Sequence, residues 1–155
     1  MKVKDLMTTN ISCIRENTTV QQAASYMRKD DIGCLPVCDD SGHIRGILTD
    51  RDIVLRTLAS DPEKDRGSKP RTSVNDILSG DIMTLSPVTV SPEANIHDAA
   101  LLFSAYQIRR LPVVEASRLV GMLSLGDIAA KPLYIDEAGD ALSAISLTGV
   151  RQAGN

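Results

Sequence analysis

The sequence predicts an α/β (α+β) fold built from two β-α-β-β-α repeats. Three observations support this prediction: an internal repeat covers most of the chain, strand-like and helix-like hydrophobic patterns alternate within each copy, and the composition is that of a globular protein. A copy of about fifty-five residues with a three-stranded sheet is marginally stable alone. We therefore expect the two copies to pack sheet to sheet around a pseudo-two-fold axis, with related clefts between them.

The composition excludes several classes of function. Of the 155 residues, 43% are hydrophobic and 24% are charged, and the formal net charge is −3. This acidic balance argues against an electrostatic nucleic-acid binder, and 3% aromatic residues are too few for a base-stacking surface. No apolar run approaches the roughly 20 residues of a membrane span, and the N-terminus has no signal-peptide pattern. We therefore expect a cytoplasmic protein with no nucleic-acid or membrane partner.

The internal repeat keeps its landmarks in order. Each copy contains three motifs: Asp-(Leu/Ile)-Met-Thr, Leu-Pro-Val, and Gly followed by two hydrophobic residues and Thr or Ser. The motifs begin at Asp5, Leu35 and Gly46 in the first copy and at Asp81, Leu111 and Gly121 in the second. The shift is 76 residues for the first two motifs and 75 for the third, because one residue is lost in the intervening turn. So many matches in one order indicate duplication.

Local signals place the elements of the first copy. We expect a strand at 11–14, a helix from Thr18, a hairpin of strands at 35–38 and 44–48, and a closing helix from Thr49. Thr18 and Gln21 have the spacing of a capping box, and apolar residues from Val20 to Met27 recur at helical spacing. Residues 39–42 read Asp-Asp-Ser-Gly, which favours the tight turn of the hairpin.

The second copy predicts the same elements at later positions. They are a strand at 88–90, a helix at 95–106, a hairpin of strands at 111–114 and 119–123, and a helix from Ser124. We also expect short helices at 74–78 and 136–145 and a frayed end at 149–155. The predicted domain organisation is a first repeat at 1–59, a polar linker at 60–72, a second repeat at 73–131 and a C-terminal extension at 132–155.

A hydroxyl residue followed three positions later by Asp marks the strand-to-helix junction of both copies. The pairs are Thr49 with Asp52 and Ser124 with Asp127. One interpretation is structural, because such a pair caps the free amides of a helix start. The other is a ligand site, because helix-start amides favour phosphate and a carboxylate can accept two hydrogen bonds from a vicinal diol. A diol with a phosphate describes a nucleotide, and both interpretations stay open.

The ordered motifs, present twice, resemble a pair of CBS domains, a Bateman module, from residue 3 to about residue 130. The resemblance implies a stand-alone regulatory module with no required cofactor. Its ligand would be an adenine nucleotide (AMP, ADP or ATP), with S-adenosylmethionine and NAD as secondary candidates. It implies that Asp52 and Asp127 hold ribose hydroxyls, with Thr49 and Ser124 near ribose or phosphate. The base would contact the backbone before the Leu-Pro strand of the opposite repeat, at 32–34 or 108–110.

The differences between the copies predict unequal sites. Arg109 and Arg110 align with Gly33 and Cys34, and the resemblance implies that such basic residues face phosphate. A solvated pair that suits the dipole of a helix end is the alternative. We expect the second junction, closed by residues 32 and 33, to favour phosphorylated ligands, and the first to bind weakly or to hold an uncharged adenosine group. The candidate ligand-binding residues are Thr49, Asp52, Ser124, Asp127, Arg109, Arg110, Arg51, Ile32, Gly33 and Ile108.

The three cysteines form no recognisable framework. An odd number argues against a disulfide set, and the spacing of Cys34 and Cys38 resembles a zinc motif only loosely. Inert strand cysteines are the simplest interpretation, with Cys34 just before its strand, and we expect no metal site. Cys13 and Cys38 lie on strands that are neighbours if the β-α-β unit is parallel, so oxidation or metal capture there is the alternative.

Catalysis is not expected. The two histidines, His43 and His97, lie far apart in the sequence, and no glycine-rich phosphate loop is present. We therefore expect a regulator that binds an adenine nucleotide and acts on an unidentified protein partner or through its own assembly. The resemblance implies a flat homodimer, either parallel or antiparallel. The alternative is a structural or redox-responsive dimer with vestigial clefts. A DNA-associated regulator is a third hypothesis, which the acidic balance disfavours.

Overall fold

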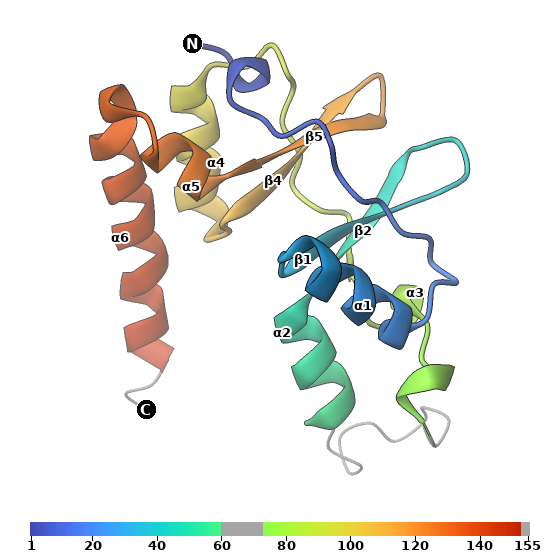
Figure 1. Ribbon diagram of the computed structural model, residues 1–155. Coiled ribbons are helices and arrows are strands. Elements are labelled where there is room, and N and C mark those ends of the chain that lie inside the picture. The colour runs from blue at the N-terminus through green and yellow to red at the C-terminus, as the bar shows by residue number, and fades with distance from the viewer. Residues whose placement is uncertain (60–72, 153–155) are drawn as a thin grey trace. The chain divides into compact units, whose positions relative to one another are not determined.

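The computed structural model describes residues 1–59 and 73–152, which form two compact units (Figure 1). The first-repeat unit is Ser12–Pro87, and the second-repeat unit combines Met1–Ile11 with Val88–Asn155. Each unit is therefore built from most of one sequence repeat and the leading segment of the other. The leading segment is 1–11 in the first repeat and 73–87 in the second. The predicted linker at 60–72 lies outside the described residues. None of the described helices is long and apolar enough to cross a membrane.

The first-repeat unit contains a three-stranded antiparallel sheet in the order β1-β2-β3. Its elements are α1 (Val20–Asp30), β1 (Cys34–Cys38), β2 (Ile44–Thr49), α2 (Asp50–Ile53) with a π-helical continuation (Val54–Leu58), a 3-10 turn (Val74–Asp76), α3 (Ser79–Ile82) and β3 (Thr84–Leu85). The predicted strand at 11–14 is reduced to one parallel bridge between Ile14 and Val37. That bridge shows that the β-α-β connection of this copy is parallel, which is the condition under which Cys13 and Cys38 lie on neighbouring segments.

The second-repeat unit contains the β4-β5 hairpin. Its elements are a 3-10 turn (Val3–Asp5), α4 (Ile96–Tyr106), β4 (Arg110–Glu115), β5 (Arg118–Ser124), α5 (Leu125–Ala129), a 3-10 turn (Pro132–Tyr134) and α6 (Ile135–Gln152). Single bridges flank the hairpin: Val90 pairs with Val113 in parallel, where a strand at 88–90 was predicted, and Thr8 pairs with Met122. The fold class and the order of elements are confirmed in both copies.

Corresponding hydrogen bonds fix the exchanged leading segments. The Val3 amide donates to the Ala94 carbonyl at 2.9 Å, just before α4. The equivalent Ser79 amide donates to the Thr18 carbonyl at 2.8 Å, just before α1. Each leading segment therefore packs beside the first helix of the other repeat, an arrangement that the sequence analysis did not anticipate. The boundaries of the compact units therefore differ from those of the sequence repeats. The repeats reflect the duplication, and the units reflect which segments pack together.

Two glycines explain why the motifs recur together. An added Cβ at Gly46 would lie 2.6 Å from the Met83 sulfur, and one at Gly121 would lie 2.7 Å from the Met7 sulfur. These methionines belong to the Asp-(Leu/Ile)-Met-Thr motifs, so each motif packs over the glycine of the opposite copy. A side chain at either glycine would displace the methionine or the adjoining backbone. The two motifs therefore form one packing unit.

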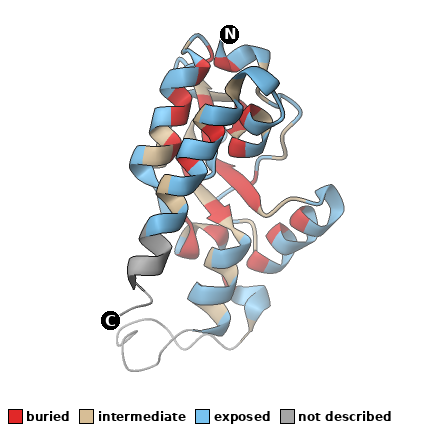
Figure 2. Cartoon of the chain, turned by 90° about the vertical axis from the view of Figure 1, so that its left-hand side faces the viewer, coloured by how far each residue is buried: buried red, intermediate tan, exposed pale blue. Residues whose placement is uncertain are grey.

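Each unit has its own hydrophobic core, and the buried positions concentrate on strands and on the inner sides of helices (Figure 2). Phe103 of α4 is fully buried in the second-repeat core, which also takes in Val3. The first-repeat core contains Met27 and, from the exchanged segment, Met83. Both cores therefore depend on residues far apart in the sequence.

Several local predictions differ from the structure. The capping box of α1 is Thr19 with Gln22, not Thr18 with Gln21, because the Thr18 hydroxyl accepts the Arg15 amide instead. Cys34 is the first residue of β1 rather than preceding it. The predicted helix at 74–78 is a 3-10 turn of three residues. Helix α6 begins one residue before the predicted 136–145 and continues to Gln152, so fraying from 149 is wrong; residues 153–155 lie outside the described chain.

Candidate functional site

The junction of β5 and α5 places Ser124 and Asp127 in contact. The Ser124 hydroxyl oxygen accepts the Asp127 amide at 3.1 Å. In return, Asp127 Oδ2 accepts both the Ser124 amide and the Ser124 hydroxyl, each at 2.7 Å. Asp127 Oδ1 has no hydrogen bond or ion pair to any residue that the structure describes. One carboxylate oxygen therefore caps the helix and the other remains available.

The junction of β2 and α2 repeats this cap with a different outcome for its aspartate. The Thr49 hydroxyl oxygen accepts the Asp52 amide at 3.1 Å, and Asp52 Oδ2 accepts the Thr49 amide at 3.0 Å. Asp52 Oδ1 faces Arg56, whose Nη2 lies 3.5 Å away. Arg56 is held in turn by the Ile82 carbonyl, which accepts Nη1 at 2.6 Å. Both carboxylate oxygens of Asp52 therefore already have partners inside the unit.

The structural interpretation of the hydroxyl-x-x-Asp pattern is thus confirmed at both junctions, since each pair forms a complete capping box. Capping is compatible with ligand binding at Ser124–Asp127, where one carboxylate oxygen is spare. At Thr49–Asp52, a ligand hydroxyl would have to share the second carboxylate oxygen with Arg56. The ligand roles of these residues remain predictions.

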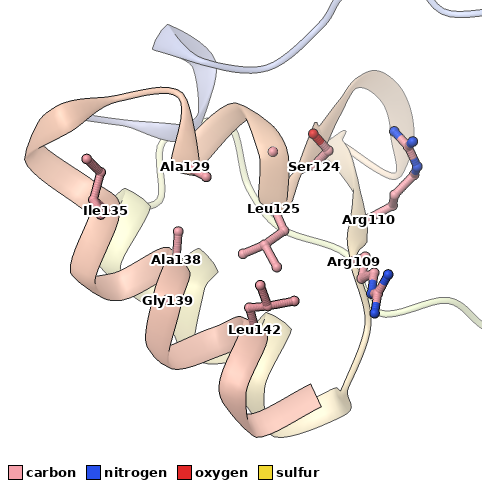
Figure 3. A pocket seen from close by; sticks show the side chains of 10 residues that line it. Arg109, Arg110, Ser124, Leu125, Ala129, Ile135, Ala138, Gly139 and Leu142 are labelled. Carbon is pink, nitrogen blue, oxygen red and sulfur yellow. The ribbon is translucent and has the colours of Figure 1, made fainter. Parts of the chain in front are cut away.

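A pocket of about 580 Å³ adjoins the second junction (Figure 3). Its wall comes from the start of β4, the β5–α5 junction and one face of α6. The lining residues are Arg109, Arg110, Ser124, Leu125, Gly126, Ala129, Ile135, Ala138, Gly139 and Leu142. The Leu125 amide donates to the Arg109 carbonyl at 3.0 Å, which ties the strand start to the helix start. Leu125 and Leu142 face one another in the close-up view, and the two arginines lie at the rim.

Only part of the predicted ligand set meets at this pocket. Arg109, Arg110 and Ser124 line it, and Asp127 adjoins it through its hydrogen bonds to Ser124. Ile108 is half-buried against the second-repeat core and is not a lining residue. Ile32 and Gly33 belong to the first-repeat unit, so their closing role stays a prediction.

Helix α6 supplies the lining residues that sequence reasoning missed. Ile135, Ala138, Gly139 and Leu142 follow a spacing of three, four and seven residues, which places them on one helix face. That periodicity was present in the sequence, but α6 has no counterpart in the first copy, so the repeat did not point to it. The second site therefore has an apolar wall from a helix that has no counterpart in the first copy.

The first junction differs in charge. Asp50 and Arg51 occupy the positions of Leu125 and Gly126. The Asp50 amide donates to the Gly33 carbonyl at 3.0 Å, and an added Cβ at Gly33 would lie 2.8 Å from Asp50 Oδ2. An exposed carboxylate therefore stands beside Gly33, where the second junction has the apolar Leu125 beside Arg109. Arg51 is also exposed, and its amide donates to Asp50 Oδ1 at 2.8 Å.

The described residues contain no group of three or more His, Cys, Asp or Glu side chains placed to hold a metal ion. The groups present at the two junctions offer hydrogen bonding, charge and apolar contact. An aspartate next to a hydroxyl, a cationic rim and an apolar wall suit a ligand with a polar sugar, an anionic group and a flat apolar ring.

Two small α/β units, each with a helix-capping hydroxyl-x-x-Asp junction, define a protein of tandem repeats that carries its candidate sites at the junctions. The CBS domain profile matches residues 3–58 and 78–134, so the chain belongs to the CBS domain family and contains a tandem pair. CBS-domain protein YhcV of Bacillus subtilis is 40% identical over 144 residues, covering 93% of this chain and 94% of YhcV. CBS-domain proteins of this kind are typically non-catalytic regulators.

Two solved structures add information on ligands. The crystal structure of CBSX2 in complex with AMP is similar with a TM-score of 0.71 and 32% identity, covering 87% of this chain and 98% of that one. The CBS domain pair of protein MJ0100, in complex with 5′-methylthioadenosine and S-adenosyl-L-methionine, has a TM-score of 0.69 and 27% identity, covering 84% and 98%. Relatives with this fold therefore bind adenosine compounds. The family match ends at residue 134, before α6 begins.

Proposed function

We propose that this protein is a regulatory module that binds an adenine nucleotide at its second junction. The observation that carries the proposal is the pocket of about 580 Å³ that has a cationic rim and an apolar wall and is lined by Ser124, the hydrogen-bond partner of Asp127. The complexes of CBSX2 with AMP and of MJ0100 with S-adenosylmethionine support an adenosine ligand. AMP, ADP and ATP are the primary candidates, because Arg109 and Arg110 favour an anionic ligand.

Each group of the second site has a physical role in this proposal. Asp127 Oδ1 accepts a ribose hydroxyl while Oδ2 keeps the helix cap intact. Ser124 lies beside ribose or phosphate, and Arg109 and Arg110 neutralise the phosphate charge. The apolar face of α6 and Leu125 provide an apolar surface for the adenine ring. The backbone at Ile108, or Ile32 and Gly33 of the other repeat, completes the base contact.

The first site is the weaker one in this proposal. Arg56 competes with a ribose hydroxyl for Asp52 Oδ1, and the Asp50 carboxylate repels phosphate. Arg51 offsets part of that repulsion from an exposed position. A ligand that carries an uncharged or cationic group on adenosine therefore suits Thr49 and Asp52 better than ATP does.

Binding becomes a signal when it changes how the two repeats pack or pair. We propose the sheet-to-sheet arrangement of repeats at 1–59 and 73–131, and a homodimer, as the assembly that ligand binding adjusts. The output is then a changed dimer or a changed contact with a protein target. The extension at 132–155 belongs to this mechanism, because its helix α6 supplies a wall of the pocket.

Thermal melting with AMP, ADP, ATP, S-adenosylmethionine and NAD in separate samples tests the proposal. A ligand at about one hundred times its dissociation constant adds about 2.7 kcal/mol, which raises the midpoint by roughly 5–10 °C in a chain of this size. We expect a rise with AMP, ADP or ATP. No rise with any of the five compounds would contradict the proposal.

A pocket-filling variant locates the effect. A Cβ added at Gly139 meets no atom within 4 Å, so Gly139→Leu fills the pocket at little cost to the fold. We expect this variant to lose the ligand-induced rise. Ser143→Leu is the matched control, because Ser143 is an exposed α6 residue outside the pocket lining, and it should keep the rise. Equal behaviour of the two variants would place the ligand elsewhere.

A further inference from the structure

Two of the three cysteines meet at the parallel bridge of the first-repeat unit. The Ile14 amide donates to the Pro36 carbonyl at 3.0 Å, and the Cys38 amide donates to the Ile14 carbonyl at 2.9 Å. Ile14 and Val37 both point into the core, where they are 4% and 0% exposed. Side chains alternate along extended chain, so Cys13 and Cys38 both lie on the other face. Because the bridge sets Cys13 level with Pro36 and Cys38 level with Arg15, the two cysteines are diagonal neighbours on this face.

The two cysteines have opposite environments. Cys38 is 2% exposed, whereas Cys13 is exposed and its thiol donates to the Ile14 carbonyl at 3.7 Å. Hydrogen bonding to Cys38, together with the positive charge of Arg15, lowers the pKa of Cys13. Hydrogen bonding to Cys13 and burial raise the pKa of Cys38. The pair therefore consists of an accessible sulfur that favours the thiolate and a shielded thiol beside it.

Arg15 is fixed at this place by two contacts of its own. Its Nη1 donates to the Cys38 carbonyl at 3.3 Å, and its Nε lies 3.4 Å from an Asp40 carboxylate oxygen. The guanidinium group thus stays at the end of β1, close to both cysteines. Its positive charge supports a Cys13 thiolate at this position.

We propose that Cys13 and Cys38 form a reversible intramolecular disulfide in response to a peroxide. The Cys13 thiolate attacks a peroxide oxygen: a sulfur–oxygen bond forms, the oxygen–oxygen bond breaks and hydroxide leaves. The Cys38 sulfur then attacks the Cys13 sulfenic acid, so that a disulfide forms and water leaves with the Cys38 proton. The two thiols lose two electrons, which the peroxide takes up. A dithiol reductant restores both thiols by exchange.

The position of the pair gives the disulfide a consequence. Cys13 lies two residues after Ile11, the last residue of the N-terminal segment that belongs to the second-repeat unit. A bond to Cys38 fastens the chain to β1 immediately after this crossing. Oxidation therefore restrains the connection through which the two units exchange their leading segments.

Thiol counting on the full-length protein before and after hydrogen peroxide tests this proposal. We expect the wild type, with three cysteines, to fall from three thiols to one, and the count to return after dithiothreitol. Cys13→Ser should keep both of its thiols. Cys34→Ala is the matched control, because it retains the pair, and it should fall from two thiols to none.

Mass spectrometry and melting complete the test. The oxidised wild type should lose two hydrogens in mass, give a linked peptide of Cys13 and Cys38, and melt at a higher temperature, because the cross-link restricts the unfolded chain. The linked peptide is detected in the wild-type protein, so this result does not depend on whether a cysteine variant folds. Three thiols that survive peroxide, a sulfinic acid at Cys13, or a covalent dimer through Cys13 would overturn the proposal.

Discussion

The two strand-to-helix junctions share one backbone design and differ in what surrounds it. Both have a complete capping box, Thr49 with Asp52 and Ser124 with Asp127. In the first, Arg56 holds the remaining Asp52 oxygen and Asp50 adds an exposed negative charge. In the second, Asp127 Oδ1 is unengaged within the described chain and arginines line the adjoining pocket. The duplication therefore preserved the helix start, and the two junctions differ in the charges that surround it.

The largest expected effect compares the two cores. Phe103 of α4 and Met27 of α1 occupy equivalent positions, and Phe103 is fully buried whereas Met27 is 7% exposed. Phe103→Ala should lower the free energy of unfolding by about 4 kcal/mol, and Met27→Ala by about 2–3 kcal/mol, because the ring leaves the larger cavity. Urea denaturation of both variants measures the difference. A larger loss for Met27→Ala would show that the first-repeat core is the more tightly packed one.

The next effect concerns the charges of the two junctions. Replacing Arg109 and Arg110 together by Ala should weaken ATP binding at least about tenfold, because charge-assisted hydrogen bonds contribute about 1.5–3 kcal/mol. Adenosine binding should change little, since adenosine carries no phosphate. Arg51→Ala is the comparison at the first junction and should leave ATP affinity unchanged. Titration calorimetry with ATP and adenosine provides both readings, and a loss that is equal for the two ligands would remove the phosphate role.

Much of this comparison was predictable from the sequence. The two copies, the hairpins, both capping boxes at the junctions and the basic pair at 109–110 follow from local spacing and from the repeat. The exchange of leading segments was not predictable, because the local spacing around a short apolar segment such as Val3 does not indicate on which copy it packs. The ion pair of Asp52 with Arg56 and the α6 wall also depend on tertiary placement, which a spacing of residues does not fix.

A smaller effect tests the caps themselves. Ser124→Ala and Thr49→Ala each remove an acceptor for the amide three residues later, which should cost about 1 kcal/mol of stability. The two losses should agree closely, because the cap is the feature that the junctions share. Thermal melting without nucleotide measures them. Losses that differ by more than about 1 kcal/mol would mean that the two caps contribute unequally to the free energy of unfolding.

The smallest effect is a pH dependence confined to the second-repeat unit. Glu93 pairs with Lys2 and Lys4, and these hydrogen bonds lower the pKa of its carboxyl group to about 2, from 4.5. A lowered pKa stabilises the folded state above pH 4.5, and this contribution is lost as the pH falls from 4.5 towards 2. The effect should be slight, since the groups are exposed. Glu93→Gln should therefore differ from wild type in melting temperature at pH 6 and match it near pH 2.

The most direct test of the central comparison is a calorimetric titration of AMP into Asp127→Asn and Asp52→Asn. Asparagine keeps an oxygen for the cap in both variants, so the two differ only in which junction loses its negative charge. We predict that Asp127→Asn weakens AMP binding about tenfold, through the loss of a charge-assisted hydrogen bond to ribose, while Asp52→Asn leaves it within about twofold. AMP affinity that is unchanged in Asp127→Asn, or reduced equally in both variants, would contradict the account.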